Sequence, residues 1–551
     1  MKKITKILSS ILGVAFVLST GYSATKLVNI EKPVEFEKRN APFFEDEFES
    51  FNPTEDASLD IFYDKFPKSN NTTNFMSLGQ ASYANINGRE VKVDAFYRLN
   101  SEALNNPNVG VGIMLYQCIK YKIAHPEEDV KAILSTYRLS VTAAVCVDED
   151  SKFYGYMRSV FDADYDEFGF VRISYMIVEA AKMGIEVRVV GHLNAYGLKQ
   201  YSATASNNIK KRDDLDFPSY FSKASKLECY EKYAKGQKVS KYLKYTKIKW
   251  TVVDKGSIDM MHNKICAVSN YIDKDGIENG PAVWFGSTNL DGIDYRGANG
   301  NNGTQSGVII SNHNEIFDIT YNYIKLVQAY PNQEDIYYLR DLVTKKNIEQ
   351  INLINEGKED QIPANEKIVY LGSESDEIFK LFFTPFGGNV GEWNTVYNPY
   401  CDYIDRFYNS KDSVEFVWNC ATFVHEFYIA YHLMEKVSIK MGDGHLDNKM
   451  YVHLDGLNTT VFDNLVPGEN CGSISVNEKM SKAVHSKDIQ MSYVDEDGLR
   501  HYLSLMSTCN FHMGALSYQT NSILIIDETD ETGNNFYKIF GDASSGGVIT
   551  L

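Results

Sequence analysis

The sequence has no pair of cysteines, and no cluster of histidines and cysteines, at the spacing of a metal site. After its first 24 residues it has no apolar run long enough to span a membrane. Positive charge is also scarce: 55 Lys and Arg residues stand against 73 Asp and Glu residues, so the formal net charge is -18. An acidic chain does not attract nucleic acid non-specifically. The composition therefore predicts a protein without metal or other cofactor, and its charge modestly disfavours nucleic acid as a partner.

The chain is long and apolar enough to form packed cores. Its 551 residues are 44% hydrophobic, which suits two large lobes or three domains and argues against disorder. The eight cysteines are widely spaced, and several stand in apolar, strand-like runs. We interpret them as buried free thiols, with disulfides as the alternative that an even number in an exported chain allows.

The first 24 residues have the pattern of a secretory signal. Lys2, Lys3 and Lys6 form a basic start, and an apolar run from Leu8 to Leu18 is too short to cross a bilayer. Small residues follow at positions 23 and 24. We therefore expect an extracellular protein; an uncleaved anchor or a buried helix is the alternative.

A histidine and a lysine two residues apart occur twice, as His262 with Lys264 and as His485 with Lys487. These are the only two His-x-Lys sequences in the chain, and each is followed by a serine five residues after its lysine. Side chains two apart in an extended chain point to the same face, so each pair can contact one ligand. One such pair is expected by chance, but two in matched surroundings indicate a common origin.

The surroundings match over a longer stretch. Each pair precedes an apolar strand that ends in small polar residues, Gly286-Ser287-Thr288-Asn289 in the first copy and Ser507-Thr508-Cys509-Asn510 in the second. Residues 304–310 then parallel residues 520–526. We interpret the chain as a diverged internal duplication with one half of the site in each repeat.

The duplication places two histidines, two lysines and two asparagines around a pseudo-two-fold axis. This set suits the transfer of the phosphoryl group of a phosphodiester. One imidazole can attack phosphorus, and the other can protonate the leaving oxygen and later take a proton from water. Lysine ammonium groups and asparagine amides can stabilise the negative charge that develops on the phosphoryl oxygens.

These motifs resemble the phospholipase D superfamily, whose signature is HxK(x)4D followed by GS-x-N, present twice per active site. The resemblance covers roughly residues 110–330 and 376–551. It implies an α/β fold of two α/β/α sandwich lobes, related by pseudo-two-fold symmetry, that share one active site. It implies His262 as the nucleophile, His485 as the acid and base, and Lys264, Lys487, Asn289 and Asn510 as phosphate ligands. Ser287 and Thr508 match the hydroxyl position of the family, and we count them with Ser269 and Ser492 as expected substrate-binding residues.

The chain departs from the family pattern at two kinds of position. The motif aspartate is Ser269 in the first copy and Ser492 in the second. Family members often have a carboxylate after GS-x-N that orients the histidine, whereas this chain has Gln305-Ser306 and Asn521-Ser522 there. An acid from elsewhere, or an amide, must then orient each imidazole.

Local patterns predict the elements around these motifs. Residues 111–124 suit a helix, 138–147 a core strand, 171–183 a helix and 185–192 a strand, and strand, helix and strand imply a parallel pair. Residues 315–329 suit a helix, and residues 414–422 and 449–454 suit strands. We predict a signal peptide at 1–24, an N-terminal arm at 25–110, a first lobe at 111–330, a linker at 331–375 and a second lobe at 376–551.

Residues 196–249 interrupt the first lobe with thirteen Lys or Arg against five Asp or Glu. They are either a solvated insertion or a basic flap that attracts an anionic substrate or a lipid surface.

We therefore expect a secreted, metal-independent phosphodiesterase of the phospholipase D type. Its expected substrate is a phospholipid at a membrane surface, hydrolysed or transferred to an alcohol through a phosphohistidine. The alternatives are an extracellular nuclease of the same superfamily and a non-catalytic protein that binds phosphate polymers. We expect a monomer that needs no protein partner.

Overall fold

The computed structural model describes the segments that carry both His-x-Lys motifs. The described residues are 80–86, 89–98, 107–136, 144–146, 170–172, 180, 184–192, 248–253, 261–273, 276–287, 305–330, 336–372, 378–386, 399–420, 436–437, 439–440, 447–454, 473–476, 485–510, 515–516 and 519–544. The predicted signal peptide and all but the last two residues of the basic insertion lie outside them. The fold is α/β, as predicted.

An eight-stranded sheet contains the first motif. Its strand order is β1-β2-β12-β11-β8-β3-β6-β7, in which β3, β6 and β7 run parallel and the other neighbours pair antiparallel. The strands are β1 (Gln80–Ile86), β2 (Arg89–Arg98), β3 (Lys131–Thr136), β6 (Glu186–His192), β7 (Ile248–Val253), β8 (Lys264–Val268), β11 (Ala282–Gly286) and β12 (Gln305–Ser311). Two small two-stranded sheets pair β4 (Ala144–Cys146) with β5 (Phe170–Arg172), and β9 (Tyr271–Ile272) with β10 (Glu278–Asn279).

A seven-stranded sheet contains the second motif and repeats this order. It runs β13-β19-β18-β17-β14-β15-β16, and each neighbour has the same relative direction as its counterpart in β2-β12-β11-β8-β3-β6-β7. Its strands are β13 (Phe379–Phe383), β14 (Glu415–Cys420), β15 (Lys449–Leu454), β16 (Ser473–Val476), β17 (Lys487–Val494), β18 (Arg500–Ser507) and β19 (Ser522–Thr529). An internal duplication predicts this repeated topology.

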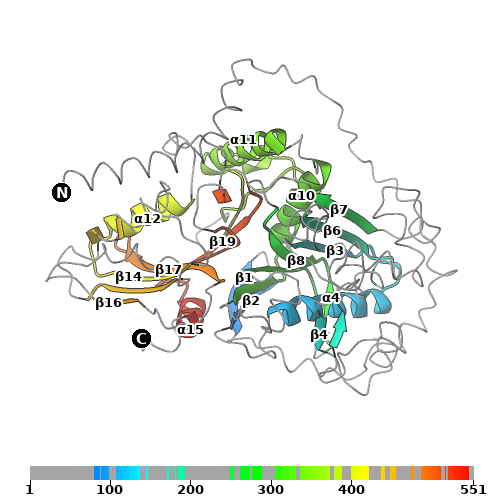
Figure 1. The fold of residues 1–551 in the computed structure, drawn as a ribbon, viewed down its shortest axis with the longest axis horizontal. Helices are drawn as coiled ribbons and strands as arrows, with labels where there is room; N and C mark the ends of the chain where they lie inside the picture. The colour runs from blue at the N-terminus through cyan, green and yellow to red at the C-terminus, as the bar shows by residue number, and fades with distance from the viewer. Residues whose placement is uncertain are drawn as a thin grey trace, which may run out of the picture. The chain divides into compact units, whose positions relative to one another are not determined.

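The helices follow the same plan. Helix α4 (Pro107–Ala124) precedes β3 and α10 (Asn314–Ala329) follows β12, just as α12 (Pro399–Asn409) precedes β14 and α15 (Asn535–Ser544) follows β19. Helices α4 and α10 cover opposite faces of the first sheet (Figure 1). Successive side chains of a strand point to opposite faces of its sheet. In β8, Ile265 and Ala267 belong to the apolar cluster that contains α10, whereas Cys266 faces Cys118 of α4.

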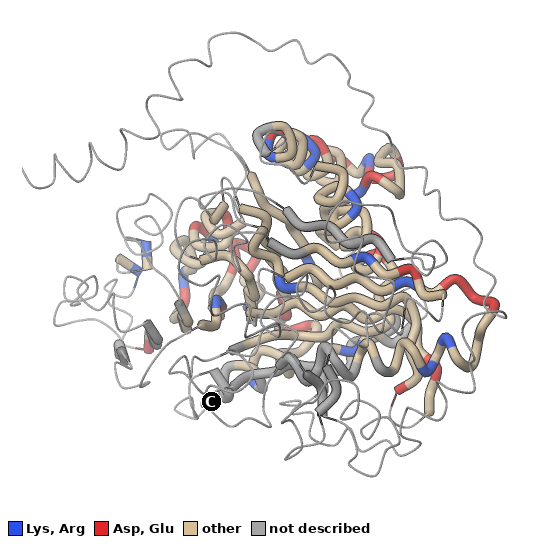
Figure 2. The backbone as a smooth tube through the Cα atoms, turned by 45° about the vertical axis from the view of Figure 1, so that its right-hand side comes forward, with Lys and Arg blue, Asp and Glu red and all other residues tan. Residues whose placement is uncertain are grey.

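One hydrophobic cluster includes residues of both sheets and of α10, together with α11 (Ile336–Asn355) of the segment between them. At the contact between α10 and the second sheet, the ring of Tyr323 stacks on Phe383 with centroids 4.0 Å apart, and its hydroxyl donates to Thr384 O at 2.9 Å. The central strands carry few charges, so Figure 2 draws them in tan along most of their length. No described helix combines the length and apolar character needed to cross a bilayer.

Most predicted elements near the motifs are confirmed. The strand at 449–454 has the predicted bounds, the strand at 185–192 and the helices at 111–124 and 315–329 differ by a few residues at most, and the linker contains α11 and a short 3-10 helix at Glu359–Gln361. The predicted parallel pair is also present, as β3 with β6.

Three predictions need correction. The parallel neighbour of β6 is β3, whereas the predicted strand at 138–147 contributes only β4, outside the main sheet. The predicted helix at 171–183 begins in a strand, β5, and is helical at Ala180; most of it lies outside the described residues. The segment predicted as an N-terminal arm, 25–110, includes β1 and β2, which extend the first sheet next to β12, so that sheet begins before the predicted boundary at residue 111.

Candidate active site

The two His-x-Lys motifs occupy equivalent places at the starts of β8 and β17. Lys264 and Lys487 are the first residues of these strands, and both side chains are buried. In each copy the lysine Nζ donates to the carbonyl oxygen of its own motif histidine, at 2.9 Å for Lys264 and 2.7 Å for Lys487. The repeated contact shows that both copies keep the same local geometry.

The first motif meets the second repeat directly. The backbone N–H of His262 donates to Thr520 O at 2.9 Å, and its Nδ1 lies 3.0 Å from Oδ1 of Asn521. Asn521 Nδ2 donates to Ala515 O at 2.8 Å, which fixes Oδ1 as the amide atom facing the imidazole. Because Oδ1 is only an acceptor, Nδ1 of His262 carries the proton and Nε2 carries the lone pair.

The charge around His262 also favours its neutral form. Burial lowers its pKa well below the usual value, and the positive charges of Lys264 and Lys487 lower it further. His485 contributes in the same direction, so the charged groups of both motifs act on His262. The hydrogen bond with Asn521 raises the pKa, but less than burial and the two lysines lower it. His262 is therefore a neutral imidazole near pH 7.

The hydroxyl groups of Ser287 and Thr508, which follow β11 and β18, bind the backbone of the neighbouring strand. Ser287 Oγ accepts from the backbone N–H of Ser306 at 2.9 Å, and Thr508 Oγ1 accepts from that of Ser522 at 3.0 Å. Thr508 Oγ1 also donates to Asn521 Oδ1 at 3.1 Å. Both hydroxyl residues are buried, so in this structure they position the backbone and Asn521.

The remaining predicted residues divide into three cases. Asn510 lies three residues after the end of β18 and is partly buried. Burial raises the thiol pKa of the neighbouring Cys509 to about 12, and the charges of Lys264 and Lys487 oppose this rise. Asn289 lies outside the described residues. Ser269 and Ser492 lie five residues along their strands from the motif lysines, about 17 Å away.

The two serines lie at the far ends of their strands, away from the histidines. Ser269 Oγ accepts from Lys131 N at 2.9 Å, and it lines a polar pocket of about 820 Å³ at that end of β8. Ser492 Oγ accepts from Arg500 at 3.1 Å. In this geometry neither serine can contact a substrate that is bound at the histidines.

The described residues offer no group of three or more His, Cys, Asp or Glu side chains that could hold a metal ion. Within the same part of the chain Cys118, Cys266, Cys401 and Cys509 are free thiols.

Two functional features were not identified from the sequence. The sequence shows only that Asn521 occupies the usual carboxylate place, and the structure shows that it orients the histidine of the other repeat. Asp488, the residue after Lys487, is a buried carboxylate that the first copy replaces by Ile265. A comparison of the two copies position by position would have shown this difference.

The chain matches no family model, and no curated protein sequence matches it. Solved structures are similar to it at low identity. A polyphosphate kinase from Porphyromonas gingivalis is 11% identical with a TM-score of 0.35; the match covers 79% of this chain and 44% of the kinase, so the chain spans less than half of that protein. A phosphatidylserine synthase from Haemophilus influenzae is 10% identical over 82% of this chain and 86% of the synthase, with a TM-score of 0.45. A yeast tyrosyl-DNA phosphodiesterase is 8% identical over 72% of this chain and 82% of its own length, with a TM-score of 0.31.

Proposed function

We propose that this chain, which has a phospholipase D-like fold, is a phosphodiesterase that works through a phosphohistidine on His262. The observation that carries the proposal is the hydrogen bond between His262 Nδ1 and Asn521 Oδ1, because it holds the ring and leaves the lone pair of the imidazole on Nε2. Burial and the neighbouring cations keep the imidazole neutral. A neutral, oriented imidazole is the form that can act as a nucleophile.

The first half of the reaction forms the covalent intermediate. Nε2 of His262 attacks phosphorus, the bond from phosphorus to the leaving oxygen breaks, and His485 in its protonated form gives its proton to that oxygen. Lys264 and Lys487 stabilise the charge on the phosphoryl oxygens. The first product leaves as an alcohol.

The second half releases the phosphoryl group. His485, now neutral, takes a proton from water, and the oxygen of that water attacks phosphorus while the bond between phosphorus and Nε2 breaks. His262 returns to its neutral form, and His485 is protonated again. An alcohol in place of water gives transfer instead of hydrolysis by the same steps.

We propose a phospholipid as the substrate and the extracellular space as the location. The acidic charge of -18 and the secretory pattern of the first 24 residues support both. The basic segment 196–249 would support a nuclease instead, and insensitivity to loss of either histidine would support a non-catalytic phosphate-binding protein.

Product analysis by mass spectrometry tests the function. The purified protein is incubated with mixed phospholipid vesicles containing a little ethanol, in parallel with His262→Ala and with His125→Ala. His125 is a partly exposed histidine that pairs with Glu128 and Glu278, and it serves as the matched control. We expect phosphatidic acid or phosphatidylethanol from the unmodified protein and from His125→Ala only.

Absence of product from every lipid would contradict the lipid proposal. The same three proteins are then given single-stranded DNA, and cleavage that requires His262 would identify a nuclease. Equal behaviour of all three proteins on both substrates would refute a phosphodiesterase of either kind.

The division of roles between the histidines gives a second test. His485→Ala should slow the hydrolysis of a diester with a poor leaving alcohol by about 10²–10⁴-fold, because that alkoxide needs a proton as it departs. A nitrophenyl diester, whose leaving group needs no proton, should be affected less in its first step. Equal losses in single-turnover measurements would contradict His485 as the acid.

A further inference from the structure

Asp488 is a buried carboxylate beside a predicted phosphate ligand. It follows Lys487 in β17 and is 1% exposed. The equivalent residue of the first copy is Ile265, which is 2% exposed and follows Lys264. The second copy thus has an ionisable group where the first has an apolar side chain, although burying a carboxylate costs free energy unless hydrogen bonds compensate.

Three donors surround this carboxylate. Its Oδ1 accepts a very short hydrogen bond from Ser306 Oγ and a second one from the backbone N–H of Lys487 at 3.1 Å. Its Oδ2 accepts from Asn419 Nδ2 at 2.8 Å. Asn419 is its neighbour in β14, while Ser306 belongs to β12 of the first sheet. The carboxylate therefore joins the two repeats.

The bond to Ser306 connects the second His-x-Lys motif to the first Gly-Ser-x-Asn motif. Ser306 donates its backbone N–H to Ser287 Oγ at 2.9 Å, and its carbonyl accepts from the backbone N–H of Ser287 at 2.8 Å. The path from Lys487 to the end of β11 is thus Asp488, Ser306 and Ser287. This connection between the repeats is separate from that of His262 with Asn521.

The strength of this connection depends on the ionisation of Asp488. Burial raises the pKa of its carboxyl to about 6, against the lowering effects of its three hydrogen bonds and of the Lys487 charge. The neighbours in β14, β18 and β12 are Asn419, Met506 and Ser306, which do not titrate, so Lys487 is the charged group that acts on it. At pH 7 and above the carboxylate is ionised and accepts all three bonds; its protonation turns one acceptor into a donor.

We propose that Asp488 is a positioning residue of this active site: its ionised carboxylate holds Ser306, and with it the end of β11, against the second His-x-Lys motif while the phosphodiester reacts. The inference rests on the proposed function. It assigns to Asp488 a role in placing the two half-sites, which Ile265 cannot have in the first copy.

The test measures kcat and KM for bis(4-nitrophenyl) phosphate from pH 5 to 8 with the full chain. The variants are Asp488→Asn, Ser306→Ala and the double variant, with Asp527→Asn as control. Asp527 is another buried aspartate of the second sheet, and it binds His501 and Lys380. Circular dichroism and gel filtration establish that each variant is folded; Ser306→Ala removes only one oxygen and keeps the test decisive if Asp488→Asn does not fold.

We expect kcat at pH 7.5 to fall about ten- to a hundredfold in Asp488→Asn and Ser306→Ala, with little change in KM, because displaced groups act mainly on the reacting complex. The double variant should lose no more than either single one. The unmodified protein should lose kcat below about pH 6, and Asp488→Asn should lack this component, so the two profiles converge in acid.

The inference is overturned if Asp488→Asn matches the unmodified protein in kcat and pH profile, or if Asp527→Asn causes the same change. If the unmodified protein and His262→Ala are equally inactive, the proposed function fails and the positioning role fails with it. An active, His262-dependent protein with an unaffected Asp488→Asn variant refutes only the inference.

Discussion

Replacing Asn521 by aspartate would change the charge next to the nucleophile without changing its shape. Aspartate keeps an oxygen at the place of Oδ1, so the 3.0 Å contact with Nδ1 of His262 can remain. Its second oxygen faces Ala515 O, which now accepts from Nδ2. The substitution therefore gives His262 an anionic partner at the price of one acceptor facing another.

The expected shift follows from Coulomb's law. Opposite unit charges about 4 Å apart attract by about 4 kcal/mol at an effective dielectric constant of about 20. This equals about three pKa units as an upper limit, since one unit corresponds to about 1.4 kcal/mol. Burial of the new carboxylate and its repulsion from Ala515 O reduce the effect, so we expect the pKa of His262 to rise by about one to two units.

The pH profile of kcat/KM measures this shift. Protonated His262 has no lone pair on Nε2, so the rate falls below its pKa, and a higher pKa moves this fall to higher pH. In the unmodified protein the pKa of His262 is well below the usual value, so its own limb lies in acid. An Asn521→Asp protein with an unchanged acid limb would refute the orientation of His262 by Asn521, and Asn521→Leu, which removes the acceptor, should lose activity at every pH.

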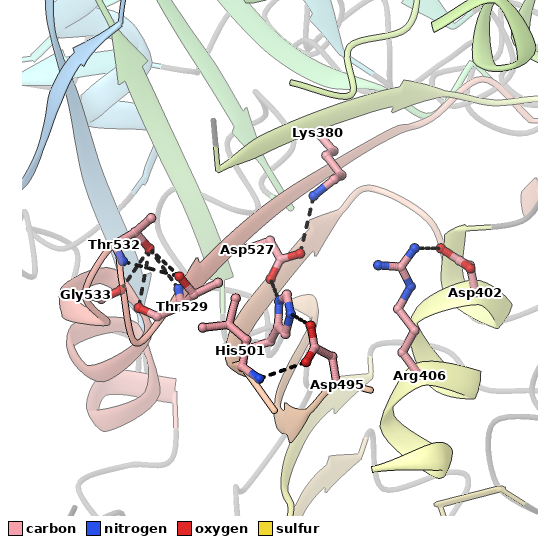
Figure 3. Close-up of polar contacts among 10 residues, drawn as sticks. Lys380, Asp402, Arg406, Asp495, His501, Asp527, Thr529, Thr532 and Gly533 are labelled. Atoms are coloured by element: carbon pink, nitrogen blue, oxygen red, sulfur yellow. Dashed lines mark hydrogen bonds and ion pairs between the residues drawn. The ribbon is translucent and has the colours of Figure 1, made fainter. Parts of the chain in front are cut away.

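Two further predictions concern stability. His501 lies between Asp527 and Asp495 (Figure 3), at 2.8 and 3.2 Å, and these carboxylates raise its pKa above the usual value despite burial. The stabilising effect of its charge is therefore complete below about pH 6.5 and is lost as pH rises through the folded pKa. In urea titrations His501→Gln should lower the free energy of unfolding by about 1–3 kcal/mol at pH 5.5 and by less at pH 8.5, and an equal loss at both pH values would contradict a charged His501. Gly307→Ala should destabilise the first sheet by about 1–3 kcal/mol, because a Cβ there would overlap the ring of Trp284; an unchanged unfolding midpoint would show that the ring can move.

The elements that the sequence predicted well are those with one clear local pattern. The strand at 449–454 and the helix at 315–329 have apolar residues at the period of their own structure. The error at 138–147 has a physical cause: β3, with the sequence KAILST, is buried on both faces after its first residue, so it shows no alternation. The longer run at 138–147 has more β-branched residues, so its composition favours a strand more strongly. Strands β1 and β2 are not predicted, because the composition of residues 25–110 as a whole conceals their local pattern.

The sequence predicts those residues of the candidate site that occur in both copies of the duplication. The paired His262 and His485 stand out because the same offsets occur twice, and the need for an amide or acid at the place of Asn521 follows from the resemblance. Which histidine the amide serves could not be predicted, because the two residues are 259 positions apart and belong to different repeats. Asp488 corresponds to Ile265 in the first copy, so the likeness of the two copies does not point to it and only the difference between them does.

The serines at the place of the motif aspartate lead to a last prediction, on activity and stability together. Ser492 lies at the far end of β17, where its Oγ accepts from Arg500, which also contacts Ser413 O and Asp412. Ser492→Asp restores the family motif and gives Arg500 a second carboxylate, so stability should rise by about 0–1 kcal/mol. The distance of about 17 Å from Lys487 leaves kcat/KM unchanged within about twofold. A large change in kcat/KM with unchanged stability would show instead that this strand end acts on the site, and it would contradict the structural role that the contact with Arg500 assigns to Ser492.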